Sequence, residues 1–423
     1  MVGVTSNIKK YVEKMNIEQI VFCIPSASEY DRKRILDICS ETKLPVKVIP
    51  FLVNLMFDET HTSLLNQVQD IKVEDLLGRE PIRFDKEGIR QFVCGKVCMV
   101  TGGGGSIGSE LVRQIAKYDP KQVIILDIYE NNAYDIQQEL LMDYGSSLNL
   151  ITLIASVRDY KRMNKIFKKY KPDIVFHAAA HKHVPLMEES PMEAIKNNVI
   201  GTFNMATLAQ FYNVKKFVMI STDKAVNPTN VMGASKRCCE MIVQYLAQQN
   251  EGCTEFVTTR FGNVLGSNGS VIPKFKRQIE QEKPVTVTHP DIIRYFMTIP
   301  EAVSLVMEAA AIAQGGEIFV LDMGQPVKIV TLAENLIRMY GKEPYKDVKI
   351  EFTGLRPGEK IKEELLMNEE GLQIDIDQER FIQQLSMLRD AAQENDEKKA
   401  VSALHSIVPT FTTPEEFNAN FTS

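Results

Sequence analysis

At 423 residues the chain is too long for one ordinary domain, and its 44% hydrophobic content is enough to bury a large core. Its 49 Lys and Arg against 55 Asp and Glu give a net charge of −6 without a long basic run, which argues against nucleic acid as the main partner. The seven Cys lack metal-ligand spacing, and no apolar run reaches the roughly 18 residues of a membrane-spanning helix, so we expect reduced thiols, no metal site and no membrane span.

The first 70 residues are predicted to form a small α/β domain. Residues 19–25 and 46–50 have the apolar pattern of strands, and residues 31–40 have helical spacing. Because the chain opens almost directly in a helix-like segment at residues 8–15, we expect this domain to be partial. A linker over residues 71–95, in which charged residues mix with Gly and Pro, follows it.

From residue 96 short apolar strands alternate with helix-like segments. Such strands indicate a parallel sheet covered on both faces, so residues 96–275 are predicted to form a doubly wound α/β (Rossmann) domain. Residues 276–367 are predicted to form a smaller substrate-binding lobe interleaved with it, and residues 368–423 a helical extension. The expected strands of the Rossmann domain are 97–100, 123–126, 149–154, 174–176 and 216–220, and the lobe has strands 284–287 and 317–320 and a helix at 331–340.

A glycine-rich loop follows the first strand of this domain. Gly102, Gly105 and Gly108 precede a helix, where small residues let the backbone approach a pyrophosphate and the helix N-terminus stabilises its charge. Asp127 ends the next strand, where a carboxylate can bind both ribose hydroxyls and repel a 2′-phosphate, which favours NAD over NADP. The alternatives are a tight turn without a ligand and an ordinary carboxylate at a strand end. The other expected cofactor contacts are Ser106, Ile107, Ser156, Val157, Arg158, Ala178, Ala179 and Lys236.

A charged cluster follows the fifth strand directly. Thr222, Asp223 and Lys224 are expected to project into the same crevice as the glycine-rich loop. Lys236 should lie on the next helix, one turn after Met232. Short-chain dehydrogenases place Tyr where this chain has Met232, and a thioether has no proton to exchange. Acid and base catalysis therefore falls to Asp223 and Lys224, unless these two form only a solvated surface pair.

Six ordered blocks carry a more specific resemblance. The chain resembles the extended short-chain dehydrogenases/reductases that act on nucleotide sugars, and more narrowly the bacterial polysaccharide-biosynthesis UDP-N-acetylglucosamine 4,6-dehydratases of the long-form branch, which also has Met in place of Tyr. Long members have membrane helices and a complete first domain, so this chain is either truncated or a naturally soluble, cytoplasmic form. The match begins near Gly78, Arg79, Glu80 and Pro81, and the blocks are residues 101–110, 177–185, 221–236, 260–267, 294–298 and 354–360.

The resemblance implies that NAD⁺ oxidises C4 of the sugar, that water leaves across C5 and C6, and that hydride returns to C6. Lys224 would remove the C5 proton, and Asp223 would protonate the departing C6 hydroxyl. Thr222 would hydrogen-bond the C4 oxygen, and Lys236 would hold the nicotinamide ribose. The proton of the C4 hydroxyl could leave through Asp223 or through a water chain.

The expected substrate is UDP-N-acetylglucosamine, and the expected product is UDP-2-acetamido-2,6-dideoxy-4-hexulose for a bacterial surface polysaccharide, made by a homo-oligomer. We predict that hydrogen-bond donors suited to a diphosphate bind this substrate, together with one carboxylate suited to the uridine ribose. Each basic residue among them could instead form a surface salt bridge. The competing functions are a UDP-sugar 4-epimerase, which normally needs a Tyr base, and a non-catalytic nucleotide-binding Rossmann protein. The predicted substrate-binding residues are His181, Lys182, Asn263, Lys274, Arg277, Arg294, Arg356 and Glu359.

Overall fold

The computed structural model describes residues 4–24, 27, 29–42, 44, 46–48, 69–70, 84–249, 254–366 and 377–422. Gly78, Arg79, Glu80 and Pro81, most of the expected linker and the start of the C-terminal extension lie outside these ranges. Contacts divide the chain into two units that alternate along the sequence. The larger unit contains Arg83–Gly262, Ile299–Met323 and Arg356–Ser423, and the smaller contains Met1–Ile82, Asn263–Thr298 and Gly324–Leu355.

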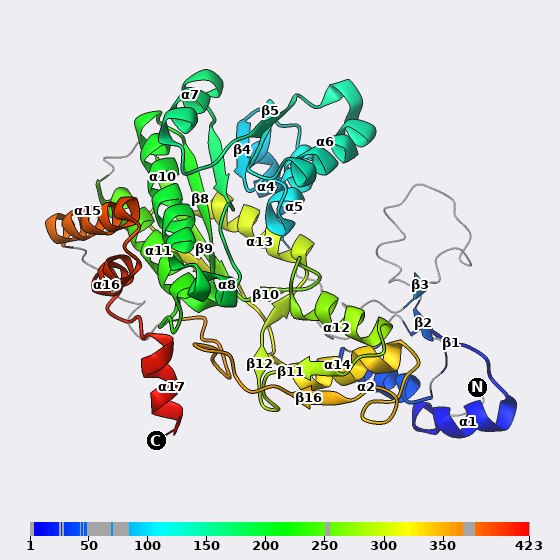
Figure 1. The fold of residues 1–423 in the computed structure, drawn as a ribbon. Helices are drawn as coiled ribbons and strands as arrows, with labels where there is room; N and C mark the ends of the chain where they lie inside the picture. The colour runs from blue at the N-terminus through cyan, green and yellow to red at the C-terminus, as the bar shows by residue number, and fades with distance from the viewer. Residues whose placement is uncertain are drawn as a thin grey trace. The chain divides into compact units, whose positions relative to one another are not determined.

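The larger unit is built on a seven-stranded sheet in the order β14-β9-β8-β7-β4-β5-β6, and every pair of neighbours is parallel. The predicted doubly wound α/β fold is therefore confirmed (Figure 1). The strands are β4 (Val97–Thr101), β5 (Gln122–Asp127), β6 (Leu150–Ile154), β7 (Ile174–His177), β8 (Lys216–Thr222), β9 (Glu255–Phe261) and β14 (Ile318–Val320).

Two of these strands differ from the sequence-based prediction. Strand β9 was not predicted, because the polar Thr258, Thr259 and Arg260 interrupt its apolar run although all three are fully buried. Strand β14 was assigned to the smaller lobe, whereas it pairs with β9 at one edge of the large sheet. Its three residues follow α13 (Ile299–Ile312), whose connection back to this sheet no local pattern reveals.

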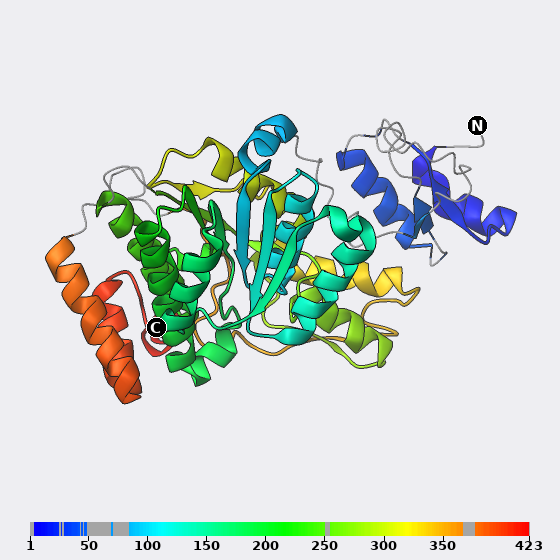
Figure 2. The ribbon, with the colours of Figure 1, turned by 90° about the horizontal axis from the view of Figure 1, so that it is seen from above.

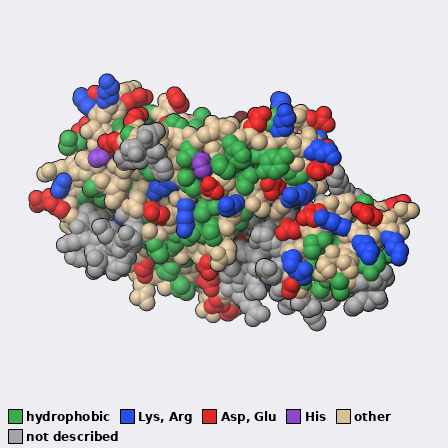
Figure 3. Space-filling model, turned by 90° about the horizontal axis from the view of Figure 1, so that it is seen from below, with side chains coloured by type: hydrophobic (Ala, Val, Ile, Leu, Met, Phe, Trp, Pro, Cys, Tyr) green, Lys and Arg blue, Asp and Glu red, His purple; other side chains and the backbone are tan. Residues whose placement is uncertain are grey.

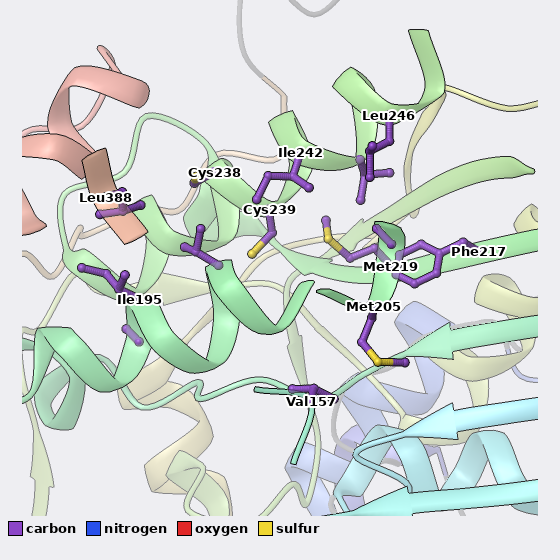
Figure 4. Close-up of a cluster of buried hydrophobic side chains, with 14 of the residues drawn as sticks. Val157, Ile195, Met205, Phe217, Met219, Cys238, Cys239, Ile242, Leu246 and Leu388 are labelled. Carbon is purple, nitrogen blue, oxygen red and sulfur yellow. The ribbon is translucent and has the colours of Figure 1, made fainter. Parts of the chain in front are cut away.

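Helices cover both faces of the sheet, as Figure 2 shows. Helix α13 contacts α4 and α5 on one face, and α10 contacts α7 and α11 on the other. Figure 4 shows the apolar cluster beneath α10 and α11, where Phe217 and Met219 of β8 meet Cys239 and Ile242 of α11. Burying a side chain such as Phe217 contributes about 1.5–3 kcal/mol. These helices and their neighbours along the chain are α4 (Lys86–Val93), α5 (Ser106–Ala116), α6 (Glu130–Tyr144), α7 (Tyr160–Tyr170), α8 (Val184–Glu189), α9 (Pro191–Ala194), α10 (Gly201–Phe211) and α11 (Val231–Gln249).

The C-terminal extension is helical, as predicted, and it completes this core. Helices α15 (Gln378–Glu394) and α16 (Glu397–Ile407) form a hairpin beside α11 (Figure 1), and α17 (Pro414–Thr422) follows. Leu388, Leu404 and Phe411 are buried in the same apolar cluster. Asp377 and Asp396 cap α15 and α16 by accepting hydrogen bonds from backbone N–H groups of the first turn.

The smaller unit has an apolar core of its own, which includes Phe275, Val285 and Leu336. Its N-terminal part contains α1, α2 and a three-stranded sheet in which β1 and β2 are parallel and β2 and β3 antiparallel. The rest consists of two helices and the strand pairs β10–β13, β11–β16 and β12–β15. The bounds are α1 (Ile8–Met15), β1 (Ile20–Phe22), α2 (Glu29–Ser40), β2 (Val46–Val48), β3 (Gln69–Asp70), β10 (Asn263–Val264), α12 (Val271–Glu280), β11 (Val285–Val287), β12 (Ile293–Arg294), β13 (Phe296–Met297), β15 (Val327–Lys328), α14 (Ile329–Met339) and β16 (Ile350–Phe352).

Acidic and basic side chains are interspersed on the face drawn in Figure 3, as the small net charge of −6 leads one to expect. Among the described helices, none joins the length and the hydropathy that a bilayer crossing requires. Six described cysteines are free thiols, and four of them, Cys39, Cys98, Cys238 and Cys239, are buried.

Candidate active site

The glycine-rich loop turns the chain from β4 into α5 by direct backbone packing. Gly102 has φ +66°, and a Cβ there would lie 2.8 Å from the backbone N of Ala179. A Cβ on Gly108 would lie 2.0 Å from the carbonyl O of Gly102, so a larger residue cannot occupy either position without moving the loop. Gly105 is the N-cap of α5, and it has no side chain that could accept from the first turn. The loop and the helix N-terminus therefore fit a pyrophosphate.

Asp127, at the end of β5, is brought to this loop. One carboxylate oxygen accepts from Gly104 N at 2.8 Å and the other from Tyr129 N at 2.9 Å. Each oxygen keeps a second lone pair, so the same carboxylate can also accept from ribose hydroxyls. Asp127 thus holds the loop in shape and remains suited to a nucleoside.

Arg158 joins the loops after β6 and β7. Its Nη2 atom lies 2.6 Å from Glu193 Oε2 and 3.1 Å from His181 Nε2. The hydrogen bond from Arg158 lowers the pKa of Glu193, and burial, followed by the charge of Arg158, lowers the pKa of His181. Ser156 Oγ accepts from Arg158 N at 3.2 Å, and Val157 is buried against Gly201. These residues form one connected edge, and their contacts with a cofactor stay predictions.

Asn198 fixes the loop after β7. It lies in a π-helix, η5 (Ile195–Ile200), its Oδ1 accepts from His181 N at 2.8 Å, and its Nδ2 donates to His181 O at 3.0 Å and to Ser235 Oγ at 2.9 Å. Ala178 N donates to Thr101 O at 3.1 Å, which holds the start of the same loop to β4. Asn198 was not predicted as a site residue from the sequence. In the structure, the π-helical turn around it points to this position, because such turns are frequent at functional sites.

His177 is fully buried at the end of β7, and its ring nitrogens lie 2.8 Å from Thr101 Oγ1 and 3.0 Å from Thr202 Oγ1. Burial, and then the charge of Lys236, lowers its pKa to about 3. Below about pH 6.5 the unfolded chain binds a proton that the folded chain does not. The free energy of unfolding should therefore fall by up to about 1.4 kcal/mol per pH unit between pH 6.5 and 4. Urea unfolding at pH 7 and pH 5 should show a smaller difference for His177→Asn, and an unchanged difference contradicts this assignment.

The predicted acid and base lie together at the end of β8. Asp223 and Lys224 form a short 3-10 turn, η6 (Asp223–Ala225). The Oδ1 atom of Asp223 accepts from Lys224 Nζ and from Thr222 Oγ1, both at 2.9 Å. Asp223 is fully buried, and its Oδ2 atom makes no hydrogen bond with any described residue. A buried oxygen in this state is available to a ligand hydroxyl.

Met232 and Lys236 lie on α11, with both side chains nearly fully buried. Lys236 Nζ donates to Ile220 O at 2.7 Å, which places the ammonium beside β8. Met232 occupies the position at which short-chain dehydrogenases have Tyr, and it packs within the apolar cluster. Its thioether carries no exchangeable proton.

A buried ion cluster lies beneath this turn. Glu240, four residues after Lys236 on α11, accepts from Arg260 Nη2 at 2.7 Å, from Arg237 Nη1 at 2.8 Å and from Ser221 Oγ at 2.7 Å. The cluster was not predicted from the sequence, although Arg237 and Glu240 lie three residues apart on α11, a spacing at which helical side chains can pair. The cluster fixes Ser221, the residue that precedes Thr222, to α11 and β9.

The predicted substrate-binding residues belong to both units. In the larger unit Lys182 follows β7, and Arg356 and Glu359 form a turn in which Glu359 Oε2 accepts from Arg356 N at 3.2 Å. In the smaller unit Asn263 N donates to Tyr295 O at 3.1 Å, beside the buried Arg294. Lys274 and Arg277 lie on α12. The substrate contacts of these residues stay predictions.

Comparisons with known proteins agree with this fold. Capsular polysaccharide biosynthesis protein CapD of Staphylococcus aureus is 51% identical over 368 residues, which are 87% of this chain and 61% of that protein. The chain thus spans about 61% of the length of this curated relative. UDP-glucose 4-epimerase of Rickettsia felis is 38% identical over 284 residues, which are 66% of this chain and 80% of that protein.

Two solved structures extend the comparison. Pen from Bacillus thuringiensis has a TM-score of 0.60 and 36% identity, and the match covers 65% of this chain and 84% of Pen. DesIV, a dTDP-glucose 4,6-dehydratase from Streptomyces venezuelae solved with NAD, has a TM-score of 0.56 and 21% identity over 64% of this chain and 88% of DesIV, which shows the fold alone. Residues 98–384, more than half of the chain, match the family described as Polysaccharide biosynthesis protein. The chain therefore belongs to this family of extended short-chain dehydrogenases/reductases.

Proposed function

We propose that this chain is an NAD-dependent 4,6-dehydratase of UDP-N-acetylglucosamine that makes UDP-2-acetamido-2,6-dideoxy-4-hexulose for a bacterial surface polysaccharide. The observation that carries the proposal is the buried Asp223, hydrogen-bonded to Lys224 at 2.9 Å and with its Oδ2 atom unbonded among the described residues. With Met232 on α11 in place of a Tyr, this pair is the acid–base group at the end of β8. The 51% identity to a capsular polysaccharide biosynthesis protein supports the pathway class.

The residues that would hold NAD are the glycine-rich loop, Asp127, Arg158 and Lys236. The close backbone packing of Gly102 and Gly108 and the N-terminus of α5 suit the pyrophosphate, and Asp127 suits an unphosphorylated ribose. When bound, NAD supplies the acceptor for the C4 hydride and the donor of hydride to C6. Lys236, buried beside β8, would bind the ribose on the nicotinamide side.

Asp223 and Lys224 would divide the proton transfers. The Oδ2 atom of Asp223, which forms no hydrogen bond with a described residue, would receive the proton of the C4 hydroxyl. The resulting acid would give a proton to the departing C6 hydroxyl, which leaves as water. The ketone formed at C4 acidifies the C5 proton, which Lys224 removes and later returns to C5. Thr222 lies 2.9 Å from Asp223 Oδ1 and would hydrogen-bond the C4 oxygen. After one turnover both side chains have regained their starting protonation states.

The nucleotide part of the substrate would be bound by the polar residues predicted for it. Guanidinium groups pair with phosphate oxygens through two parallel hydrogen bonds, so Arg294 and Arg356 are proposed for the diphosphate and Glu359 for the uridine ribose. The remaining proposed contacts are His181, Lys182, Asn263, Lys274 and Arg277.

A UDP-sugar 4-epimerase is the second candidate, because a UDP-glucose 4-epimerase is 38% identical over 66% of this chain. Incubation of the purified protein with UDP-N-acetylglucosamine, followed by proton NMR and mass spectrometry, separates the two. We expect a 4-keto-6-deoxy product that has lost one water. A C4 epimer of unchanged mass would support the epimerase, and unchanged substrate would leave only a nucleotide-binding role.

A further inference from the structure

A segment of the larger unit lies along the Asp223–Lys224 turn. We call residues 356–366 the strap. A Cβ on Gly358 of the strap would lie 2.3 Å from the carbonyl O of Thr229, and Gly358 has φ +67°, so only Gly allows this approach. Its hydrogen bonds to the residues that follow η6 are Thr229 Oγ1 to Gly358 O at 2.7 Å, Asn230 Nδ2 to Gly358 O at 3.3 Å, Asn227 Nδ2 to Glu364 Oε2 at 3.0 Å and Lys360 Nζ to Val226 O at 3.1 Å.

The other end of the strap is tied to the buried ion cluster. Arg260, fully buried on β9, donates from Nη1 to Leu365 O at 3.1 Å while its other nitrogens bind Glu240. The strap is therefore fixed on both sides of Glu363. Its backbone cannot move away from Lys224 without breaking these bonds.

This anchoring places a second carboxylate beside Lys224. Glu363 Oε1 lies 3.9 Å from Lys224 Nζ, in addition to the 2.9 Å contact of Lys224 Nζ with Asp223 Oδ1. The Asp223 side chain is 0% exposed and that of Glu363 is 6% exposed, so solvent screens neither interaction strongly. Lys224 thus forms ion pairs with two buried carboxylates, of which the sequence predicted only Asp223.

We propose that Glu363 is a positioning residue that holds Lys224 beside Asp223 and stabilises the ammonium that forms when Lys224 takes up a proton. That this proton comes from C5 of the sugar rests on the proposed function. In the proposed order of reaction steps, Asp223 becomes neutral once it accepts the C4 hydroxyl proton. Glu363 then supplies a negative charge next to Lys224 at the moment when Lys224 removes the C5 proton, which makes Lys224 a stronger base.

The other charged side chains nearby on the described elements have partners of their own. On the strap, Lys360 and Glu364 form an ion pair at 3.3 Å. On α11, which packs against η6, Lys236 donates to Ile220 O, and Arg237 pairs with Glu240. Glu364 therefore offers a matched control, since it is a carboxylate one residue away that pairs with Lys360 and Asn227.

Acylation of Lys224 tests the charge coupling without substrate. The full chain is treated with an amine-selective acetylating reagent at a series of pH values, and Lys224 modification is measured by peptide mass spectrometry. Loss of the Glu363 charge favours the neutral amine of Lys224. At pH values below the midpoint of the plot of labelling rate against pH, Lys224 should therefore be acetylated about tenfold faster in Glu363→Gln than in the unaltered protein. Glu364→Gln should label at the unaltered rate. Equal labelling in folded Glu363→Gln and the unaltered protein overturns the proposal, whatever the turnover.

Glu363→Asp covers the case in which Glu363→Gln does not fold. The shorter side chain withdraws the carboxylate by about 1.5 Å, so labelling of Lys224 should rise about twofold, and an unchanged rate again overturns the proposal.

Dehydration kinetics give a second readout. Because Lys224 must be neutral to act as base, kcat rises with pH, and Glu363→Gln should move this rise to lower pH and reduce the maximal kcat with KM unchanged. Faster labelling in Glu363→Gln together with no dehydration by the unaltered protein would support the coupling and reject the dehydratase.

Discussion

The Asp223→Asn protein is expected to lose about 10²- to 10⁴-fold in kcat for formation of the 4-keto-6-deoxy sugar, the range attributed to a general acid or base. The amide keeps the shape of the side chain but cannot accept the C4 hydroxyl proton or protonate the departing C6 hydroxyl. The hydrogen bonds of Asp223 go to Thr222 and Lys224, and those of Asp127 go to Gly104 and Tyr129, so NAD should remain bound. Product NMR and the absorbance of cofactor released on denaturation measure the two quantities.

Asp159→Asn is the matched control for this substitution. Asp159 caps α7 by accepting from Arg162 N at 2.9 Å, and Asn caps helices about as well as Asp. Its turnover should equal that of the unaltered protein. Normal turnover by Asp223→Asn would remove Asp223 from the mechanism.

Replacing Glu240 with Gln should lower the free energy of unfolding of the larger unit by about 3–5 kcal/mol, because it leaves Arg237 and Arg260 buried without a full counter-charge. Both arginines and the carboxylate are almost completely buried, so water cannot compensate. The urea midpoint measures the change. Glu394→Gln breaks an exposed pair with Lys399 and should change the free energy by less than about 1 kcal/mol.

The same cluster sets a pH dependence. Burial by itself raises the pKa of Glu240, but the charges of Arg260 and Arg237, together with the hydrogen bonds from Arg260 and Ser221, outweigh burial and lower it below its usual value. A depressed pKa gives stability that is complete above the unfolded value of about 4.3 and is lost as the pH falls through the folded value. The deficit of Glu240→Gln should therefore be largest at neutral pH and shrink in acid. A deficit independent of pH contradicts the role of this ion cluster.

The Rossmann sheet was predictable because most of its strands are unbroken apolar runs between helix-like segments. Strand β9 was not predicted because its polar side chains hide the apolar pattern. These side chains can be buried because they bind partners from elsewhere in the chain, such as Glu240 for Arg260. Strand β14 was placed in the wrong part because three residues do not record which sheet they pair with. Patterns along the chain therefore revealed the apolar strands but not the pairing of the polar or very short ones.

The proposed acid–base pair could also be predicted from the sequence, since Asp223, Lys224, Met232 and Lys236 lie close together along the chain. Glu363 was not, because it reaches Lys224 only through the hydrogen bonds of the strap. Asn198 was missed for the same reason, as its partners lie on the loop after β7 and on α11. Supporting residues of this kind are set by tertiary contacts rather than by local motifs.

The proposed reaction is tested most directly by the fate of the hydrogen on C4 of the sugar. UDP-N-acetylglucosamine deuterated at C4 is incubated with the protein, and the position of deuterium in the product is read by NMR. A 4,6-dehydratase removes this deuterium as hydride and returns it to C6, so we predict a 4-keto product with deuterium in its C6 methyl group. Deuterium found at C4 of an epimer, or retained at C4 of unchanged substrate, would contradict the dehydratase.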